Sequence, residues 1–336
     1  MSGGVDSSVA VYLMKERGFE VSGVTFRLFE DSPKENEEDA EKVASRLEIP
    51  HFVKDYTADF KKEVIDRFVF SYENELTPNP CVECNRHIKF KKLFSLAQEL
   101  GFSHIVTGHY AVIEEKDGRF LLKKAADKTK DQTYFLFSLT QEILSRTVFP
   151  LGNMTKPQIR EIAEREGFVN AKRRDSQDIC FVPNGDYVSV IEAYSQKRYP
   201  EGDFVDLNGK VLGRHRGVIR YTIGQRKGLG LALPAPMYVL EKRISDNKVV
   251  LGFNEDLHSK TLVAEDLNWI MFDTPPKSFR AKIKVRYSQN EHDGTVTCLE
   301  NGRVKVEFDT PVRAITKGQA VVFYDGDYVI GGGTII

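Results

Sequence analysis

The first half of the chain alternates short apolar strands with amphipathic helices, and this alternation restricts the fold more than any other feature. The spacing predicts helices over residues 6–17, 35–47 and 85–100, and strands over 21–26, 51–53 and 104–107. Repeated strand–helix–strand units of this size imply a parallel sheet with helices on both faces. We therefore expect an α/β domain whose ligands bind at the carboxyl ends of the strands.

After about residue 190 the pattern changes to short strands separated by glycine and proline turns. Residues 237–244 and 248–252 predict a hairpin. Strand-like runs at 280–286, 294–299, 304–308 and 320–324 suggest a small β-barrel. A chain of 336 residues also exceeds what one hydrophobic core usually holds. We predict an α/β domain over 1–190, a small linking domain over 191–256 and a C-terminal β-barrel over 257–336.

Composition and cysteine spacing limit the class of protein. Hydrophobic residues make up 41% and charged residues 29%, which excludes disordered and collagen-like chains. No apolar run approaches ~20 residues, so we expect no membrane partner, and the polar start does not resemble a secretory signal. The irregularly spaced Cys81, Cys84, Cys180 and Cys298 predict cytosolic thiols, with Cys298 in the barrel core. We therefore expect a cytoplasmic protein.

The charge is divided unevenly along the chain. The net charge is −1, but residues 1–80 carry −7 and residues 81–336 carry +6. A near-neutral total can therefore contain a basic face, which is what a phosphate backbone needs. The alternative is a set of solvated charges scattered by chance. The division permits an RNA partner without requiring one.

Residues 2–8, with the sequence Ser-Gly-Gly-Val-Asp-Ser-Ser, stand at the start of the first predicted helix. Two glycines let the backbone approach an anion, and the N–H groups of a helix N-terminus favour negative charge. The segment has no lysine of the G-x-x-x-x-G-K-[ST] type, so it fits a leaving pyrophosphate better than a transferred phosphoryl group. The alternative is an ordinary helix start capped by Asp6 or Ser7.

This segment resembles the pyrophosphate loop of the ATP pyrophosphatases, and further motifs narrow the resemblance to the bacterial tRNA-specific 2-thiouridylases. These motifs follow that family's order along the chain. They are Thr77–Asn85 with Ile88–Phe90, Thr107–Tyr110, Lys130–Phe135, Phe149–Gly152, Asp175–Phe181 and Tyr221–Leu229.

The resemblance implies a tRNA uridine 2-sulfurtransferase. Such an enzyme uses ATP with Mg²⁺ to adenylate the 2-oxygen of the wobble uridine in tRNAs that read Lys, Glu and Gln codons. Sulfur carried as a cysteine persulfide then attacks C2, and AMP leaves. The implied partners are the tRNA and a sulfur-relay protein or cysteine desulfurase that supplies the sulfur.

By the same resemblance, Cys180 carries the persulfide, and Cys84 releases the sulfur as a disulfide forms. Arg86, Lys89 and the start of the predicted helix would lower the thiol pKa of Cys84. The sequence departs from the family at Cys81, where many members have an acidic residue. Cys81, Cys84 and Cys180 could therefore hold a [4Fe–4S] cluster with one open iron. The persulfide and cluster routes both remain open.

The resemblance also implies contacts to the substrates. The ATP contacts are Ser2, Gly3, Gly4, Val5, Asp6, Ser7, Phe26 and Gly108. The contacts to tRNA and to its flipped target base are Asn79, Pro80, Cys81, His109, Lys130, Asp131, Gln132, Arg286, Tyr287 and Gln319. Core burial is the alternative for Phe26, and a structural role is the alternative for His109. Arg173 and Arg174 are candidate phosphate contacts on charge alone.

The family normally has an apolar strand before the pyrophosphate loop, whereas this sequence starts at Met1, directly before Ser2. Either the start of the sequence is misassigned or the loop lacks that strand. Two rival functions remain. One is an amide- or lysidine-forming ligase of the same superfamily, which would need neither Cys84 nor Cys180. The other is a non-catalytic tRNA- or iron–sulfur-binding protein with the same fold.

Overall fold

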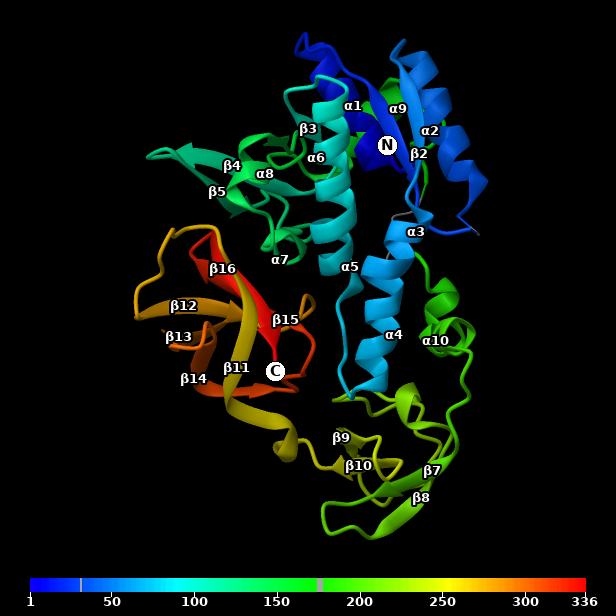
Figure 1. Ribbon diagram of the computed structural model, residues 1–336, viewed down its shortest axis with the longest axis vertical. Coiled ribbons are helices and arrows are strands. Elements are labelled where there is room, and N and C mark those ends of the chain that lie inside the picture. Colours follow the sequence, from blue (N-terminus) through cyan, green and yellow to red (C-terminus); the bar gives the residue numbers. More distant parts are fainter. Residues whose placement is uncertain (31, 174–177) are drawn as a thin grey trace.

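The computed structural model of the chain describes residues 1–30, 32–173 and 178–336 (Figure 1). Helices and strands alternate at the start, as predicted. The elements up to β3 are α1 (Val5–Glu16), β1 (Gly23–Arg27), α2 (Lys34–Arg46), β2 (His51–Asp55), α3 (Thr57–Phe60), η1 (Lys61–Ile65), α4 (Asp66–Glu73), α5 (Pro80–Glu83), η2 (Cys84–Lys89), α6 (Phe90–Glu99) and β3 (Ile105–Val106).

Strands β1, β2, β3 and β6 (Thr147–Val148) of this α/β part are parallel, as predicted, but they form two separate pairs. Strand β1 pairs with β2, and β3 pairs with β6. Within the described ranges, no strand joins the two pairs into one sheet. Met1 lies beside β1, where the Thr25 hydroxyl donates to the Met1 carbonyl at 2.7 Å.

One helical run carries the cysteine motif and differs from the prediction at its start. Helix α5, the π-helical segment η2 and α6 follow one another without a break from Pro80 to Glu99. The run begins five residues before the predicted start at Asn85 because Pro80 occupies the first turn, where its missing N–H costs nothing. Cys84 therefore lies inside the helix rather than at its N-terminus.

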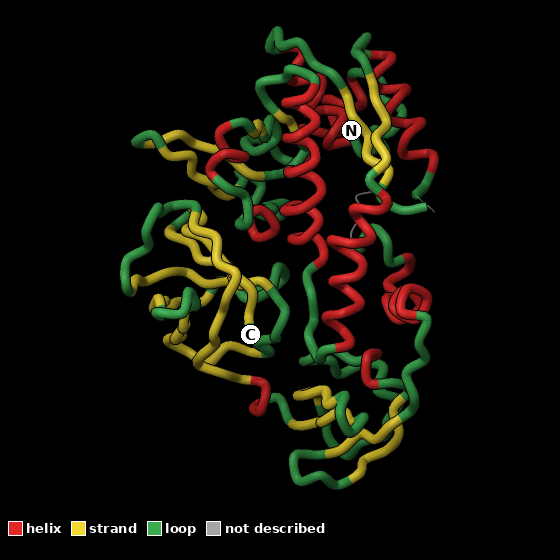
Figure 2. The backbone as a smooth tube through the Cα atoms, in the orientation of Figure 1, coloured by secondary structure: helices red, strands yellow, loops and turns green. Residues whose placement is uncertain are grey.

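Two further domains follow, as the sequence predicted (Figure 2). The linking domain holds a sheet of β7 (Gly202–Val205), β8 (Val211–His215), β9 (Tyr238–Arg243) and β10 (Lys248–Gly252), with the predicted hairpin as β9 and β10. The barrel strands are β11 (His258–Trp269), β12 (Ser278–Lys284), β13 (His292–Cys298), β14 (Val304–Arg313), β15 (Ala320–Asp325) and β16 (Tyr328–Ile335). Pairing of β11 with both β14 and β16 closes the barrel.

A hairpin of the α/β part extends the barrel sheet, which the sequence reading missed. Strands β4 (Ala111–Lys116) and β5 (Arg119–Lys124) pair with each other, and Lys123 of β5 pairs with Tyr328 of β16. The remaining elements are α7 (Thr133–Leu136), α8 (Gln141–Ser145), α9 (Lys156–Arg165), η3 (Pro183–Gly185), α10 (Tyr187–Ser195), η4 (Val218–Arg220) and η5 (Glu255–Leu257).

The hydrophobic cores cross the domain boundaries. One core contains Cys84 and Ile88 together with Phe204 and Val239 of the linking domain. A second joins Phe90 and the α7 region to the barrel strands β15 and β16. The α1–α9 layer and the barrel interior each have a further core. In the part of the chain that the structure describes, no helix is long and apolar enough to cross a membrane.

The alternation of buried and exposed residues along β12 predicts that two neighbouring substitutions change the free energy of unfolding by different amounts. Ile283 of β12 is fully buried, whereas its neighbour Lys282 is exposed. Ile283→Ala should lower the free energy of unfolding by about 2–5 kcal/mol, because it removes buried methyl groups and leaves a cavity. Lys282→Ala should change it by less than about 1 kcal/mol. Urea unfolding of both variants measures this; equal effects would contradict the alternation.

Candidate functional site

The backbone of the Ser2–Ser8 loop lies very close to the residues that pack against it. Gly3 has φ +72°, and a Cβ there would lie 2.5 Å from the Asn36 carbonyl oxygen, so only glycine fits. The Ser7 hydroxyl accepts from the Ser2 N–H at 3.1 Å and donates to the Gly4 carbonyl at 3.0 Å. The N-cap is Gly4, and no described side chain caps it, so capping by Asp6 or Ser7 is wrong. The first N–H groups of α1 are therefore available to an anion.

Two side chains from the far end of the α/β part hold this loop, and sequence reasoning missed one of them. The buried Asn170 amide donates to the Gly3 carbonyl at 2.8 Å and to the Ser8 hydroxyl at 3.0 Å. Arg173 donates to the Gly3 carbonyl at 3.4 Å and pairs with Asp39 at 3.1 Å. Arg173, a candidate phosphate contact, thus braces the loop.

A buried lysine that the sequence did not single out fixes Asp6. The Lys156 ammonium contacts both Asp6 carboxylate oxygens at 2.7 and 2.8 Å, and the Tyr110 hydroxyl donates to Asp6 at 2.7 Å. Lys156 begins α9 after Thr155, which forms a capping box with Gln158. That capping pattern, readable in the sequence, marks the helix start but not its contact with Asp6.

Gly108 reaches the loop, whereas Phe26 packs elsewhere. A Cβ on Gly108 would lie 2.7 Å from the Asp6 carbonyl carbon and the Ser7 nitrogen, so this strand end lies against the start of α1. Gly108 follows β3 by two residues, which places the loop at the carboxyl end of a parallel strand, as expected. Phe26 packs edge-to-face on Tyr56 at 4.8 Å, against the core that contains Cys84.

The helical run from Pro80 places two cysteines near a third, which follows the undescribed residues 174–177. Cys81 and Cys84 are one turn apart, and the Cys84 N–H donates to the Cys81 carbonyl. Cys84 is buried, while Cys81 and Cys180 are exposed, and each of these three thiols interacts with the Lys89 charge. The four cysteines lie in the described part of the chain, and all are free. Cys298, predicted in the barrel core, packs partly buried against it.

The charges here differ from the sequence expectation. Burial raises the pKa of Cys84 to about 12, and the Lys89 ammonium opposes this rise. Burial also acts to lower the pKa of Lys89, but Cys84, Cys81 and Cys180 outweigh it and raise that pKa. The predicted low thiol pKa of Cys84 is therefore wrong, because the thiol lies in a hydrophobic core. Arg86 does not assist it, since Arg86 pairs with Asp266 of β11.

The three thiols do not form a metal-binding group. Among residues 1–30, 32–173 and 178–336, no set of three or more His, Cys, Asp or Glu side chains is arranged to hold a metal ion. Lys89 instead places an ammonium next to Cys81, Cys84 and Cys180. An ammonium group stabilises separate thiolates, whereas cluster ligands share their charge with iron. The cluster alternative therefore does not fit the residues that the structure describes.

His109 packs on Phe90, the first residue of α6. Its Nδ1 is 2.8 Å from the Thr107 hydroxyl, and its ring packs on Phe90 and Phe149. Burial, with a smaller effect of Lys89, lowers the pKa of His109 to about 3. The imidazole is therefore neutral at physiological pH.

Several residues that were predicted to contact tRNA form hydrogen bonds within the protein. Asp131 accepts from the Ala125 N–H and the Thr133 hydroxyl, and Gln132 accepts from the Tyr110 N–H. These bonds hold the backbone around β4 and α7. Asn79 contacts the Tyr134 hydroxyl, and Pro80 is buried. Lys130 contributes positive charge near Tyr287.

The predicted barrel contacts join the domains. Arg286 donates to the Ile223 carbonyl of the linking domain and to the Thr316 hydroxyl. Gln319 donates to the carbonyls of Thr77 and Pro78 at 2.8 and 3.2 Å. Tyr287 stays exposed beside Phe135, with 4.4 Å between ring centroids. Among the barrel residues that were predicted to contact tRNA, Tyr287 has an exposed ring that is accessible to a ligand.

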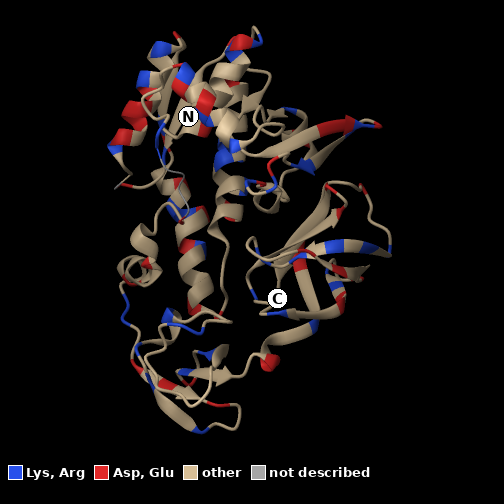
Figure 3. Ribbon diagram, turned by 180° about the vertical axis from the view of Figure 1, so that it is seen from behind, with Lys and Arg blue, Asp and Glu red and all other residues tan. Residues whose placement is uncertain are grey.

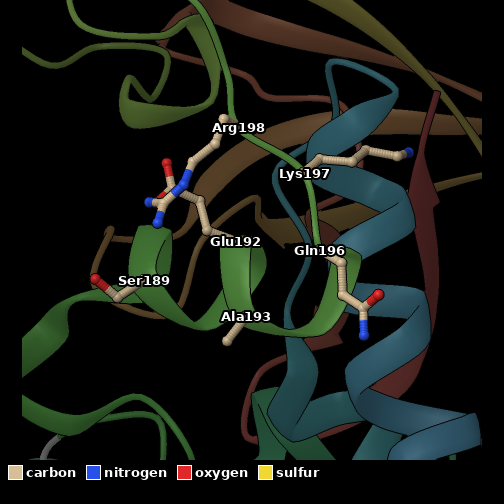
Figure 4. Close-up of a pocket in the computed structure, with 6 residues that line it drawn as sticks. All are labelled: Ser189, Glu192, Ala193, Gln196, Lys197 and Arg198. Carbon is tan, nitrogen blue, oxygen red and sulfur yellow. The ribbon is translucent and has the colours of Figure 1, made fainter.

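Other surface features lie apart from these residues. A hollow beside α10 is lined by Ser189, Glu192, Ala193, Gln196, Lys197 and Arg198 (Figure 4). Glu192 there pairs with Arg198 at 2.6 Å and Arg220 at 3.3 Å. Figure 3 shows basic and acidic side chains mixed over the α/β part, the linking domain and the barrel. Arg174 and the first residues of the Asp175–Phe181 motif lie outside the described residues.

The comparisons with known proteins cover the whole chain. Residues 1–184 match the tRNA methyl transferase HUP domain family, residues 189–253 the tRNA methyl transferase PRC-barrel domain, and residues 259–335 the aminomethyltransferase beta-barrel domain.

The relatives that match along nearly their whole length share the name tRNA-specific 2-thiouridylase MnmA. The chain is 47% identical over 347 residues to the tRNA-specific 2-thiouridylase MnmA of Clostridioides difficile (strain 630), which covers 100% of this chain and 96% of that protein. It is 48% identical over 340 residues to MnmA 1 of Clostridium botulinum (strain Okra / Type B1), with coverage of 100% and 96%. It is 47% identical over 349 residues to MnmA of Acetivibrio thermocellus, with coverage of 100% and 97%.

The Lys89 charge predicts how Cys84 reacts. Lys89→Met removes the cation that opposes the raised Cys84 pKa, so the thiolate fraction at a given pH should fall by about tenfold or more. The iodoacetamide alkylation rate of Cys84, followed by peptide mass spectrometry between pH 7 and 10, should fall accordingly. Lys91→Met, two residues along the same helix, is the control. An unchanged rate in Lys89→Met would show that Lys89 does not act on this thiol.

Proposed function

The chain belongs to the tRNA-specific 2-thiouridylase family, and we propose on this basis that it replaces the 2-oxygen of the wobble uridine with sulfur in tRNAs that read Lys, Glu and Gln codons. The observation that carries the proposal is the grouping of Cys84 and Cys180 around Lys89, in a chain matched along its whole length by enzymes of that name. Neither an amide-forming nor a lysidine-forming ligase would need these thiols.

The loop residues account for the activation step. ATP would adenylate the uridine 2-oxygen, and the pyrophosphate would leave at the Ser2–Ser8 loop, where Gly3 and Gly4 let the N–H groups of α1 approach it. Mg²⁺ would arrive with the phosphates and neutralise part of their charge. Asp6 is already held by Lys156 and Tyr110, so its main task is to fix the start of α1.

The thiols account for the sulfur step. The terminal sulfur of a Cys180 persulfide would attack C2, and AMP would leave with the former 2-oxygen. The Cys84 thiolate would then attack the Cys180 sulfur, breaking the S–S bond so that the sulfur stays on C2 and a Cys84–Cys180 disulfide forms. A thiol reductant would restore both cysteines. Lys89 would hold the negative charge that moves among these sulfurs.

The partners follow from the same chemistry. A sulfur-relay protein or a cysteine desulfurase would load the exposed Cys180. The target uridine would have to leave its stack to reach these thiols. Asn79, Cys81 and Tyr287 remain the proposed contacts to tRNA. We propose that the enzyme acts in the cytoplasm, on the tRNA found there.

The proposed function is tested by the products of ATP cleavage. With a tRNA that carries an unmodified wobble uridine and a persulfide donor, we expect AMP, pyrophosphate and 2-thiouridine, and no cleavage without that tRNA. Cys180→Ala should still release pyrophosphate but should lower 2-thiouridine formation by roughly 10³-fold or more, because the sulfur nucleophile is gone. Full thiolation by Cys180→Ala, or ATP cleavage at the same rate with and without tRNA, would refute the proposal.

A second prediction concerns the contact between Gly108 and the loop. Gly108→Ala places a methyl group 2.7 Å from the backbone of Asp6 and Ser7, so the loop must move. The KM for ATP should rise about tenfold or more. Glu115→Ala is the control, since Glu115 lies exposed on β4. Initial rates at varied ATP concentration measure both, and an unchanged KM in Gly108→Ala would remove Gly108 from the ATP site.

A further inference from the structure

Prolines limit the backbone hydrogen bonds that segment 75–79, directly before the cysteine helix, can form. Pro78 and Pro80 have no backbone N–H, and the residues before them are disfavoured in the helical conformation. Glu75 has φ +65°, which is unusual for a residue other than glycine. Within the α/β part, the Leu76 N–H donates to the Ser71 carbonyl at 2.9 Å. The carbonyls of the segment depend on hydrogen bonds from elsewhere.

Those bonds come from the two other domains. The carbonyls of Leu76, Thr77 and Pro78, three residues in a row, accept from side chains outside the α/β part. Lys242 of the linking domain donates to Leu76 at 3.2 Å. Gln319 of the barrel donates from Nε2 to Thr77 at 2.8 Å and to Pro78 at 3.2 Å. Both N–H bonds of the Gln319 amide are thus directed at this segment.

The barrel also approaches the segment through its backbone. The Thr77 N–H donates to the Lys317 carbonyl at 2.9 Å. Gly318 has φ +87°, and a Cβ there would lie 2.9 Å from the Leu76 Cβ. Gly318 and Gln319 thus contact the same residues, which lead into the cysteine helix.

The position of this segment sets the start of the cysteine helix. Asn79 is the N-cap residue of the run that begins at Pro80, and its carbonyl accepts from the Val82 N–H at 3.1 Å. Cys81 and Cys84 lie in the next two turns. A displacement of the Thr77 and Pro78 carbonyls would therefore pass directly to these thiols.

We propose that Gln319 is a positioning residue for Cys84: it holds the 77–78 backbone and so couples the barrel, which carries the proposed tRNA contact Tyr287, to the thiol that would release the sulfur. This inference rests on the proposed function of Cys84. In this role the Gln319 amide nitrogen does not contact tRNA, because both of its N–H groups donate to carbonyls of the protein. A change at the barrel surface on docking would act on the cysteine helix through this residue.

The test compares Gln319→Met, which keeps the length of the side chain without a donor, with Gln319→Lys, which restores one. Gln289→Met is the matched control, since Gln289 also donates to a carbonyl of the barrel, that of Arg313 at 3.1 Å. We measure kcat and KM for tRNA in thiolation, the alkylation rate of Cys84 in the free protein, and the melting temperature of each variant.

For Gln319→Met we expect kcat to fall roughly tenfold, from the loss of two hydrogen bonds, with KM for tRNA within about twofold. Cys84 alkylation should accelerate, because a loosened helix start opens more often. Gln319→Lys should recover most of kcat, and Gln289→Met should behave like the wild type.

A raised KM with unchanged kcat in Gln319→Met would overturn the inference and make Gln319 a tRNA contact. An unchanged Cys84 alkylation rate, or no recovery in Gln319→Lys, would also overturn it. Failure of the proposed function is distinguishable, because it would leave the wild type without tRNA-dependent AMP formation. In that case the Cys84 alkylation rates would still test whether Gln319 positions the helix.

Discussion

The structure depends on one helical run that packs into two cores at once. Cys84 and Ile88 enter the core shared with the linking domain, whereas Val82, Phe90 and Phe94 enter the core shared with the barrel. The π-helical segment from Cys84 to Lys89 directs Cys84 and Ile88 into the first core, and the residues on either side of it, Val82 and Phe90, enter the second. The arrangement of the three domains and the burial of Cys84 follow from this one element.

The same packing creates the electrostatic conflict at the thiols. A thiol in a hydrophobic core resists ionisation, and burial raises the pKa of Cys84 to about 12. Lys89, one turn further along the helix, supplies the opposing charge, and Cys81 and Cys180 keep its own pKa raised. A buried nucleophile with a cation beside it is protected from solvent oxidants and still able to react with a sulfur brought to it.

Much of the fold was readable from the sequence, because local patterns dictate local structure. The helices α1 and α2, the strands β1 and β2, the β9–β10 hairpin and the barrel strands β12 to β15 followed from periodicity and turn residues, whereas β11 and β16 were not predicted. The β4–β5 hairpin was missed, and it adds to the barrel sheet through a single pair, Lys123 with Tyr328. Such a pairing between distant segments leaves no local signal.

The site was readable to a lesser degree. Loop, glycine and cysteine positions came from motifs, and the structure brings Gly108 to the loop and Lys89 to the thiols. Arg86 was assigned to Cys84 by closeness in sequence, but it faces Asp266 in the barrel. Asn170 and Lys156, which hold the loop, had no signal beyond a helix cap.

The sequence by itself determined the domain order, the anion-binding loop and the pair of thiols, because glycine geometry, strand period and cysteine chemistry are properties of neighbouring residues. The tertiary structure alone decided which distant polar groups meet: Lys156 with Asp6, Lys89 with Cys180, and Gln319 with the segment before the cysteine helix. These partners are between 91 and 242 positions apart. Their contact is set by the packing of whole elements, so no local pattern could have predicted it.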